Sequence, residues 1–159
     1  MNFRIRDIKL PSDETVALSF IEGSQHFERV FEPDRRVDST VAAEHYAVLM
    51  AQVAKGGGCV FIADQDGRAI GWAVFVVGKS PLFVIEEQRA FGHIAELFVE
   101  EPARGLGVGR ALIAACEDEA RGIGLGHVMI GVLTANRRAA DIYARSGYAP
   151  YTAELRKYL

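Results

Sequence analysis

Three glycines at alternate positions, Gly105, Gly107 and Gly109, lead directly into an amphipathic helical pattern over 107–121. A glycine inside a helix costs roughly 1 kcal/mol relative to alanine, so this run indicates a backbone that must stay free of side chains. The preceding segment, 90–101, has the pattern of a strand. A strand, a tight glycine turn and a helix start present unpaired N–H groups and the positive end of a helix dipole. The sequence therefore predicts a site for an anion, most naturally a phosphate, at this turn.

Two common phosphate-binding loops do not match this run. Counting from Gly105, the second glycine of a Walker loop and the third glycine of a dinucleotide fingerprint would both fall at Arg110. A similar string, RGIGLG over 121–126, follows a helix and precedes a strand. Gly122 or Gly124 is therefore expected to end a helix, where the dipole is negative and does not favour a phosphate.

Hydrophobic periodicity and turn residues predict the element order β-α-α-β-β-β-α-β-α-β, a mixed sheet covered by helices. The N-terminal part is predicted to hold a strand over 2–10, a helix over 13–31 with a weak point at Gly23, a helix over 38–58 capped at Asp38 or Ser39, and a hairpin over 59–78 that turns at Asp66-Gly67. After a loop over 80–90, the C-terminal part is predicted to hold the strand 90–101, the helix 107–121, a strand over 127–134, a helix over 135–147 ended by Gly147, and one or two short strands over 148–159.

Composition excludes several classes of protein. A chain of 159 residues is most simply one domain, 1–159. Its net charge of −3 argues against nucleic acid as a partner. The sequence shows no signal peptide and no apolar run long enough to span a membrane, so we expect a cytoplasmic protein. Cys59 and Cys116 are expected to be free thiols, and the spacing of His26, His45 and His127 predicts no metal site.

Two stretches resemble the motifs of one enzyme superfamily. The stretch ELFVEEPARGLGVGRALI resembles motif A of the Gcn5-related N-acetyltransferase (GNAT) superfamily, whose signature is Arg/Gln-x-x-Gly-x-Gly/Ala. Arg104, Gly107 and Gly109 occupy the signature positions. The stretch NRRAADIYARSGYAPY is similar to motif B, and its matching residues are Asn136, Ala139, Tyr143, Gly147 and Tyr148. The resemblance spans about 89–152, extends to the hairpin 59–77, and is only topological over the first 50 residues.

The resemblance implies the acyl-CoA N-acyltransferase fold, an α+β arrangement in which helices cover both faces of a mostly antiparallel sheet. It also implies acetyl-CoA as cosubstrate, bound where two parallel strands splay apart. The strand end would pair with the pantetheine arm and the glycine turn would hold the pyrophosphate, with Arg104 and Arg110 adding charge. Asn136 would contact the pantetheine or cap its helix. The residues implied in acetyl-CoA binding are Leu97, Phe98, Val99, Arg104, Gly105, Leu106, Gly107, Val108, Gly109, Arg110 and Asn136.

The implied chemistry is direct acetyl transfer to a neutral amine, which needs a base, an oxyanion donor and an acid. Tyr143 fits the acid, because it lies two helical turns after Asn136 and so on the same face; a core tyrosine is the alternative. Glu96 fits the base, acting through a water, although it could instead face solvent or pair with an arginine. His93 or a chain of waters are the other candidates. A backbone N–H near Val99 would stabilise the oxyanion.

The acceptor is expected to be a primary amine of a small molecule. A protein N-terminus or lysine is the first alternative, and a non-catalytic CoA-binding sensor is the second. A cationic amine would be favoured if Glu28, Glu32 and Asp34 border the acceptor cleft. Exposed strands are expected near the C-terminus, and they are compatible with a homodimer.

Overall fold

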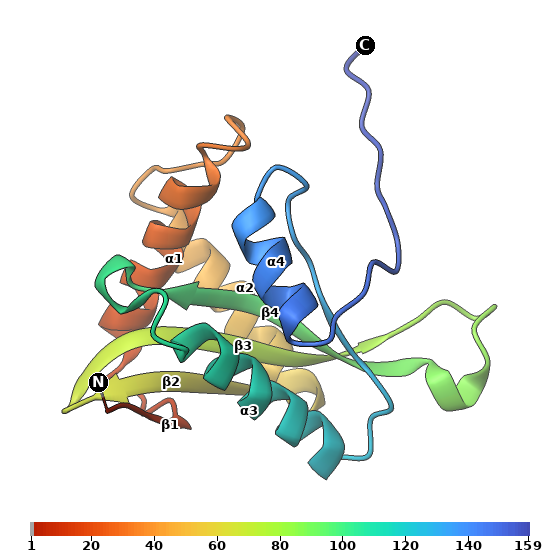
Figure 1. The fold of residues 1–159 in the computed structure, drawn as a ribbon, viewed down its shortest axis with the longest axis horizontal. Coiled ribbons are helices and arrows are strands. Elements are labelled where there is room, and N and C mark those ends of the chain that lie inside the picture. Colours follow the sequence, from red (N-terminus) through yellow and green to blue (C-terminus); the bar gives the residue numbers. More distant parts are fainter. Residues whose placement is uncertain (1) are drawn as a thin grey trace.

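The computed structural model describes residues 2–159. Its helices are α1 (Glu14–Glu28), α2 (Val41–Gly56), α3 (Val108–Gly122) and α4 (Arg137–Arg145). Its strands are β1 (Arg4–Asp7), β2 (Cys59–Gln65), β3 (Arg68–Lys79), β4 (Ala90–Val99) and β5 (Val128–Ile130). The five strands form one sheet in the order β1-β2-β3-β4-β5, in which only β4 and β5 run parallel (Figure 1). The predicted α+β fold with a mostly antiparallel sheet is confirmed.

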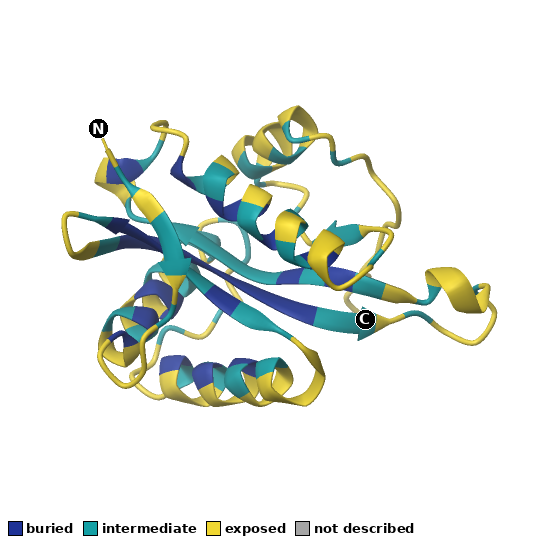
Figure 2. Ribbon diagram, turned by 90° about the horizontal axis from the view of Figure 1, so that it is seen from below, coloured by how far each residue is buried: buried dark blue, intermediate teal, exposed yellow. Residues whose placement is uncertain are grey.

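Helices cover both faces of the sheet (Figure 2). On one face α1 and α2 bury a cluster that includes Phe20 and Trp72. On the other face α3 buries a second cluster that includes Phe75 and Leu112. The strand β3 supplies both clusters because successive side chains of a strand point to opposite faces. This explains why its sequence is an almost continuous apolar run rather than an alternating one.

A buried ion-pair network fixes the start of α1, the helix that forms one wall of the cavity described below. The Arg6 guanidinium donates to both carboxylate oxygens of Asp13, at 2.6 and 3.0 Å, and to Asp64 at 3.0 Å. Asp13 also accepts a hydrogen bond from the backbone N–H of Lys9 at 2.7 Å. The Arg6 hydrogen bond lowers the pKa of Asp13, so the carboxylate is charged at neutral pH. The network therefore joins β1 to the beginning of α1.

The hairpin turn and the cap of α2, both predicted from local sequence, can be compared with the structure. Asp66 and Gly67 have φ angles of 52° and 85° and make the predicted hairpin turn. The predicted cap of α2 is wrong, because Thr40 is its N-cap residue. Asp38 instead accepts hydrogen bonds from the Thr40 backbone N–H and hydroxyl, at 3.1 and 2.7 Å, in the turn before the helix.

The prediction of strands over 148–159 is also wrong. This segment extends away from the sheet without regular secondary structure (Figure 1). Its alternating apolar residues, among them Tyr151 and Leu155, are exposed. A strand needs a hydrogen-bonded neighbour, whereas this segment is held by ion pairs from Arg156 to Glu32 and Asp34. The predicted strand 127–134 is likewise shortened to β5.

None of the helices in the described part of the chain combines the length and apolar character needed to cross a membrane.

Candidate active site

The parallel strands β4 and β5 separate after a short paired stretch. Their pairing covers only Gly92, His93 and Ile94 of β4, whereas β4 continues to Val99. Glu100 donates its backbone N–H to β3 at 3.0 Å, and alternate residues of a strand face opposite edges. The backbone groups of Leu97 and Val99 therefore point away from β3, toward the space that β5 leaves. The end of β4 thus offers the backbone groups of Leu97 and the N–H of Val99 to this space.

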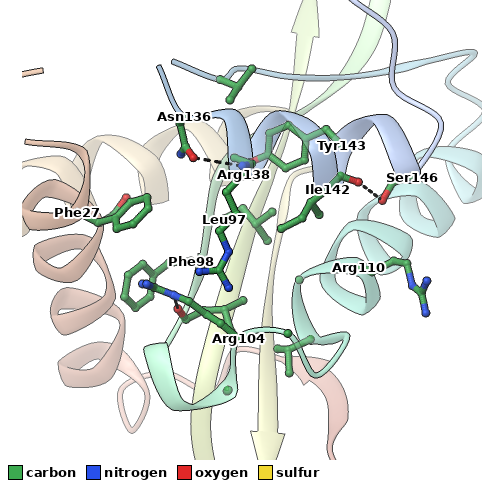
Figure 3. A pocket seen from close by; sticks show the side chains of 18 of the residues that line it. Phe27, Leu97, Phe98, Arg104, Arg110, Asn136, Arg138, Ile142, Tyr143 and Ser146 are labelled. Atoms are coloured by element: carbon green, nitrogen blue, oxygen red, sulfur yellow. Dashed lines mark hydrogen bonds between the residues drawn. The ribbon is translucent and has the colours of Figure 1, made fainter. Parts of the chain in front are cut away.

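A cavity of about 610 Å³ lies at this opening. Its walls are the end of β4, the turn before α3, one side of α1 and the length of α4 (Figure 3). All the residues that the sequence predicted for acetyl-CoA binding line it, and so does Tyr143. They are Leu97, Phe98, Val99, Arg104, Gly105, Leu106, Gly107, Val108, Gly109, Arg110 and Asn136. Segments that are remote in the chain therefore meet here as the motifs predicted.

The glycine turn places the N-terminus of α3 on this cavity. Gly105 and Gly107 have φ angles of 80° and 86°, a region in which residues with a β-carbon are strained. Gly107 is the N-cap residue, and no side chain caps the helix. The N–H groups of the first turn of α3 therefore lack a side-chain partner beside a cavity.

The second glycine string ends α3, as predicted. Gly124 has a φ angle of 77°, and Leu125 donates its N–H to the Ala120 carbonyl at 2.8 Å. This is the hydrogen bond of a glycine C-cap. Two similar strings therefore have opposite roles because they stand at opposite ends of one helix.

Arg104 is turned differently from the prediction. Its Nε donates to the Val99 carbonyl at 2.9 Å, and its guanidinium lies 5.0 Å from the ring centre of Phe27 and 5.7 Å from that of Phe98. These contacts hold its charge against aromatic rings that belong to α1 and β4. Arg104 lines the cavity, but its guanidinium is already engaged by the Val99 carbonyl and the two aromatic rings.

Sequence reasoning missed two arginines of α4. Arg138 and Arg145 line the cavity together with the predicted Arg110. Figure 3 shows Arg138 reaching from α4 toward the end of β4, while Arg110 extends away from the other labelled side chains. Within residues 2–159, none of these three arginines forms an ion pair with a carboxylate. The seven-residue spacing of Arg138 and Arg145, which matches that of Asn136 and Tyr143, could have revealed them.

Tyr143 is partly buried, lines the cavity and also packs against the α3 cluster. Burial, together with the carboxylates of Glu28 and Glu96, raises the pKa of its phenol to about 12. Tyr143 is therefore a neutral hydrogen-bond donor at pH 7. Tyr143 therefore packs against the core, as one alternative from the sequence has it, and its role as the acid stays a prediction.

Glu96 lies next to the cavity rather than among the residues that line it. Its side chain is 12 % exposed, and its Oε1 lies 2.7 Å from Nε2 of His45 in α2. It therefore neither faces solvent nor pairs with an arginine, and its partner was missed. The other candidate base, His93, sits where β4 is paired on both sides, opposite Val76 and Met129. Burial lowers the pKa of His93, which keeps its imidazole neutral.

Asn136 is the N-cap residue of α4. Its Oδ1 accepts a hydrogen bond from the backbone N–H of Ala139 at 3.2 Å. The capping alternative is thereby confirmed, and the contact with pantetheine stays a prediction.

Of the three carboxylates Glu28, Glu32 and Asp34, one borders the cavity. Glu28 lines the cavity and accepts a 2.9 Å hydrogen bond from Arg35. Glu32 and Asp34 do not line it, and both pair with Arg156. The idea that all three carboxylates border the cleft is therefore wrong, because Glu32 and Asp34 lie outside the cavity lining and pair with the C-terminal segment instead.

The cysteines are free thiols, as predicted. Burial raises the pKa of Cys59 to about 12 and raises that of Cys116 as well, so neither is a thiolate at neutral pH. Within residues 2–159 the structure brings together no group of three or more His, Cys, Asp and Glu side chains that could hold a metal ion.

Known proteins share this architecture. Residues 22–148 match the Acetyltransferase (GNAT) family. An uncharacterized N-acetyltransferase of Methanocaldococcus jannaschii is 31% identical over 91 residues, which are 57% of this chain and 52% of the relative. The chain thus spans about half the length of that curated relative.

Solved structures resemble the chain over nearly its whole length. A protein of Bacillus halodurans, solved as a tetramutant, superposes with a TM-score of 0.81 at 19% identity and 100% coverage of both chains. Glucosamine-6-phosphate N-acetyltransferase of Arabidopsis thaliana superposes with a TM-score of 0.71 at 15% identity and 99% coverage of both. Likeness at such identities shows a shared fold.

Proposed function

The chain belongs to the GNAT acetyltransferase family, and we propose that residues 1–159 form one domain that moves the acetyl group of acetyl-CoA to a primary amine of a small molecule. One observation carries the proposal. Among the described residues 2–159, no side chain caps the N-terminus of α3 and no carboxylate pairs with Arg110, Arg138 or Arg145, and all of these groups line the same cavity. Such a site favours a ligand with several phosphate charges, and acetyl-CoA, the cosubstrate of this family, is one.

The residues present fit acetyl-CoA part by part. The backbone N–H groups of 105–110 suit the pyrophosphate, and Arg138 and Arg145 suit the remaining phosphate charge. The backbone groups of Leu97 and the N–H of Val99 suit the amides of the pantetheine arm, because a strand edge binds extended amide chains through hydrogen bonds. The phosphates and the pantetheine amides of the ligand thus have matching groups on the protein.

Acetyl-CoA would supply a thioester whose carbonyl carbon the amine attacks and whose sulfur leaves. The phenol of Tyr143, neutral at pH 7, donates the proton that the departing sulfur needs. Glu96 takes the proton that the amine loses, and it does so through a water because its side chain lies beside the cavity. The backbone N–H of Val99 faces the opening and donates to the carbonyl oxygen.

The walls of the cavity favour a small acceptor. Ser24, Phe27 and Glu28 of α1 face α4 across the cavity, so the acceptor enters between two helices. A folded protein surface fits such a space poorly. Glu28 adds a carboxylate that suits an amine with positive charge.

The test is acetylation of a panel of amines with release of free CoA thiol as readout. The panel holds spermidine, tyramine, glucosamine 6-phosphate, an aminoglycoside and two peptides with free N-termini and lysines. We expect acetylation of at least one small amine, with product confirmed by mass, and a much lower rate for the peptides. Acetylation of peptides alone would favour the protein-directed alternative. Tight acetyl-CoA binding without any transfer would favour the sensor.

A further inference from the structure

His45 and Glu96 form a pair between two elements that are remote in the sequence. His45 lies on α2, Glu96 lies on β4, and their Nε2 and Oε1 atoms are 2.7 Å apart although the residues are 51 positions apart. The exposed fractions of the two side chains are 35% and 12%. The carboxylate is thus largely shielded, and the imidazole beside it reaches solvent.

Neighbouring elements supply the charges that act on this pair. Across the sheet, Glu96 lies opposite Val74 of β3, which is fully buried. From β4 the Glu96 carboxylate raises the pKa of His45 above its usual 6.5, burial opposes this, and Glu28 of α1 adds to it. Tyr143 of α4, which the same two carboxylates influence, is neutral. The net effect on His45 is a raised pKa, so its imidazole takes up a proton more readily than a free imidazole does.

We propose that His45 is the group that carries the reaction proton from Glu96 to solvent, an inference that rests on the proposed function. The N–H bond of the ammonium breaks and its proton reaches a Glu96 oxygen through a water. That O–H bond then breaks as an N–H bond forms at Nε2 of His45. The imidazolium releases one proton from its exposed side to solvent. As the C–N bond forms and the C–S bond breaks, the nitrogen loses a second N–H proton. Tyr143 gives its phenol proton to the departing sulfur and regains one from this second N–H, so one proton in all reaches solvent and no electrons are gained or lost.

The proton relay is needed because the Glu96 carboxylate is shielded from solvent. A carboxylate that keeps the proton is neutral and cannot serve the next amine, and at 12% exposure Glu96 has little contact with bulk solvent apart from the cavity water that brings it the amine proton. His45 is the neighbour in hydrogen-bond contact with it that also reaches solvent. A pair that only fastened α2 to the sheet would not need to exchange protons.

The first readout is independent of catalysis. An NMR titration of the free protein follows the imidazole of His45, with the exposed His26 of α1 as internal control. We expect His45 to titrate above 6.5 and to fall toward or below that value in Glu96→Gln, while His26 stays unchanged in both proteins. A His45 that titrates alike in both proteins would overturn the inference, because the two groups would then share no proton.

The second readout is the rate of acetylation against pH with the fastest small amine of the panel. We expect His45→Gln to lower kcat about tenfold, less than the roughly 100-fold or more that loss of a base costs. We expect added imidazole to restore the rate and the KM for acetyl-CoA to stay constant. The matched control, His26→Gln, should behave as the wild type.

The outcomes separate the two proposals. A wild type that acetylates amines together with a His45→Gln variant of unchanged pH profile, or of lowered rate without rescue by imidazole, overturns the relay alone. A wild type that transfers no acetyl group to any amine removes the proposed function and the relay together. If His45→Gln folds poorly, His45→Asn at the same position takes its place under the same criteria.

Discussion

The Nε atom of Arg104 donates a hydrogen bond of 2.9 Å to the carbonyl oxygen of Val99, the last residue of β4. The guanidinium also lies 5.0 Å from the ring of Phe27 in α1. Arg104 therefore joins the glycine turn, the strand end and α1, three of the elements that enclose the cavity.

Arg104→Lys should lose both contacts, because an ammonium has neither the planar fork nor the stacking face of a guanidinium. The hydrogen bond and the cation–π contacts with Phe27 and Phe98 predict a loss of about 1–2 kcal/mol in the free energy of unfolding. Arg121→Lys, on the exposed last turn of α3, is the control. Equal denaturant midpoints for the two variants would show that Arg104 does not hold the wall.

Arg138→Ala should weaken acetyl-CoA binding about 10- to 100-fold, the usual value of a charge-assisted hydrogen bond to phosphate. Its neighbour Arg137 lies at the first position of α4 but does not line the cavity, so Arg137→Ala is the matched control. Calorimetry at two salt concentrations is the measurement. The loss should shrink in high salt because screening weakens the lost contact. Similar affinities for both variants would exclude Arg138 from the phosphate site.

Gly107→Ala should destabilise the protein by about 1–3 kcal/mol, because alanine is strained at a φ of 86°. Gly109→Ala is the matched control, since Gly109 has no positive φ and a β-carbon there would meet only Val99 Cγ2, at 3.8 Å. Thermal unfolding of the two variants compares them directly. If Gly109→Ala were the more destabilised, the turn would not depend on the backbone conformation of Gly107.

Tyr143→Phe should lower kcat about 100-fold and leave the KM for acetyl-CoA nearly unchanged, because only the proton of the phenol is lost. Tyr148→Phe is the control, since its ring lies 6.3 Å from that of Tyr143 and it does not line the cavity. With a pKa near 12, Tyr143 stays protonated as the pH rises to 10. A wild-type rate that falls between pH 8 and 10 through loss of a phenol proton would contradict this role.

Local sequence signals predicted most of the fold because each depends on a few neighbouring residues. The turn at Asp66-Gly67, the cap at Asn136 and the C-cap at Gly124 follow from backbone preferences that no distant residue overrides. The alternation over 148–159 failed for the opposite reason. A strand exists only with a partner, and β5 ends at Ile130 without pairing to this segment.

The part of the site that the two motifs cover was predictable from the sequence. The glycine turn and Tyr143 are marked in the sequence and meet at one cavity. The pairing of His45 with Glu96 was not predictable, because it depends on how α2 lies over β4. Gly23 shows the same limit. In the sequence it is a weak point of a helix, whereas in the structure a β-carbon there would lie 2.6 Å from the Phe98 ring.

The most direct test of the central claim, that the cavity at the start of α3 binds acetyl-CoA, is thermal unfolding with acetyl-CoA, and with ATP and NAD as controls. At about a hundred times Kd, we expect acetyl-CoA to add about 2.7 kcal/mol to the free energy of unfolding. For a domain of this size that is a rise in Tm of roughly 5–10 °C. A rise with acetyl-CoA well above that with ATP or NAD would support the claim. No rise with acetyl-CoA, or an equal rise with all three, would contradict it.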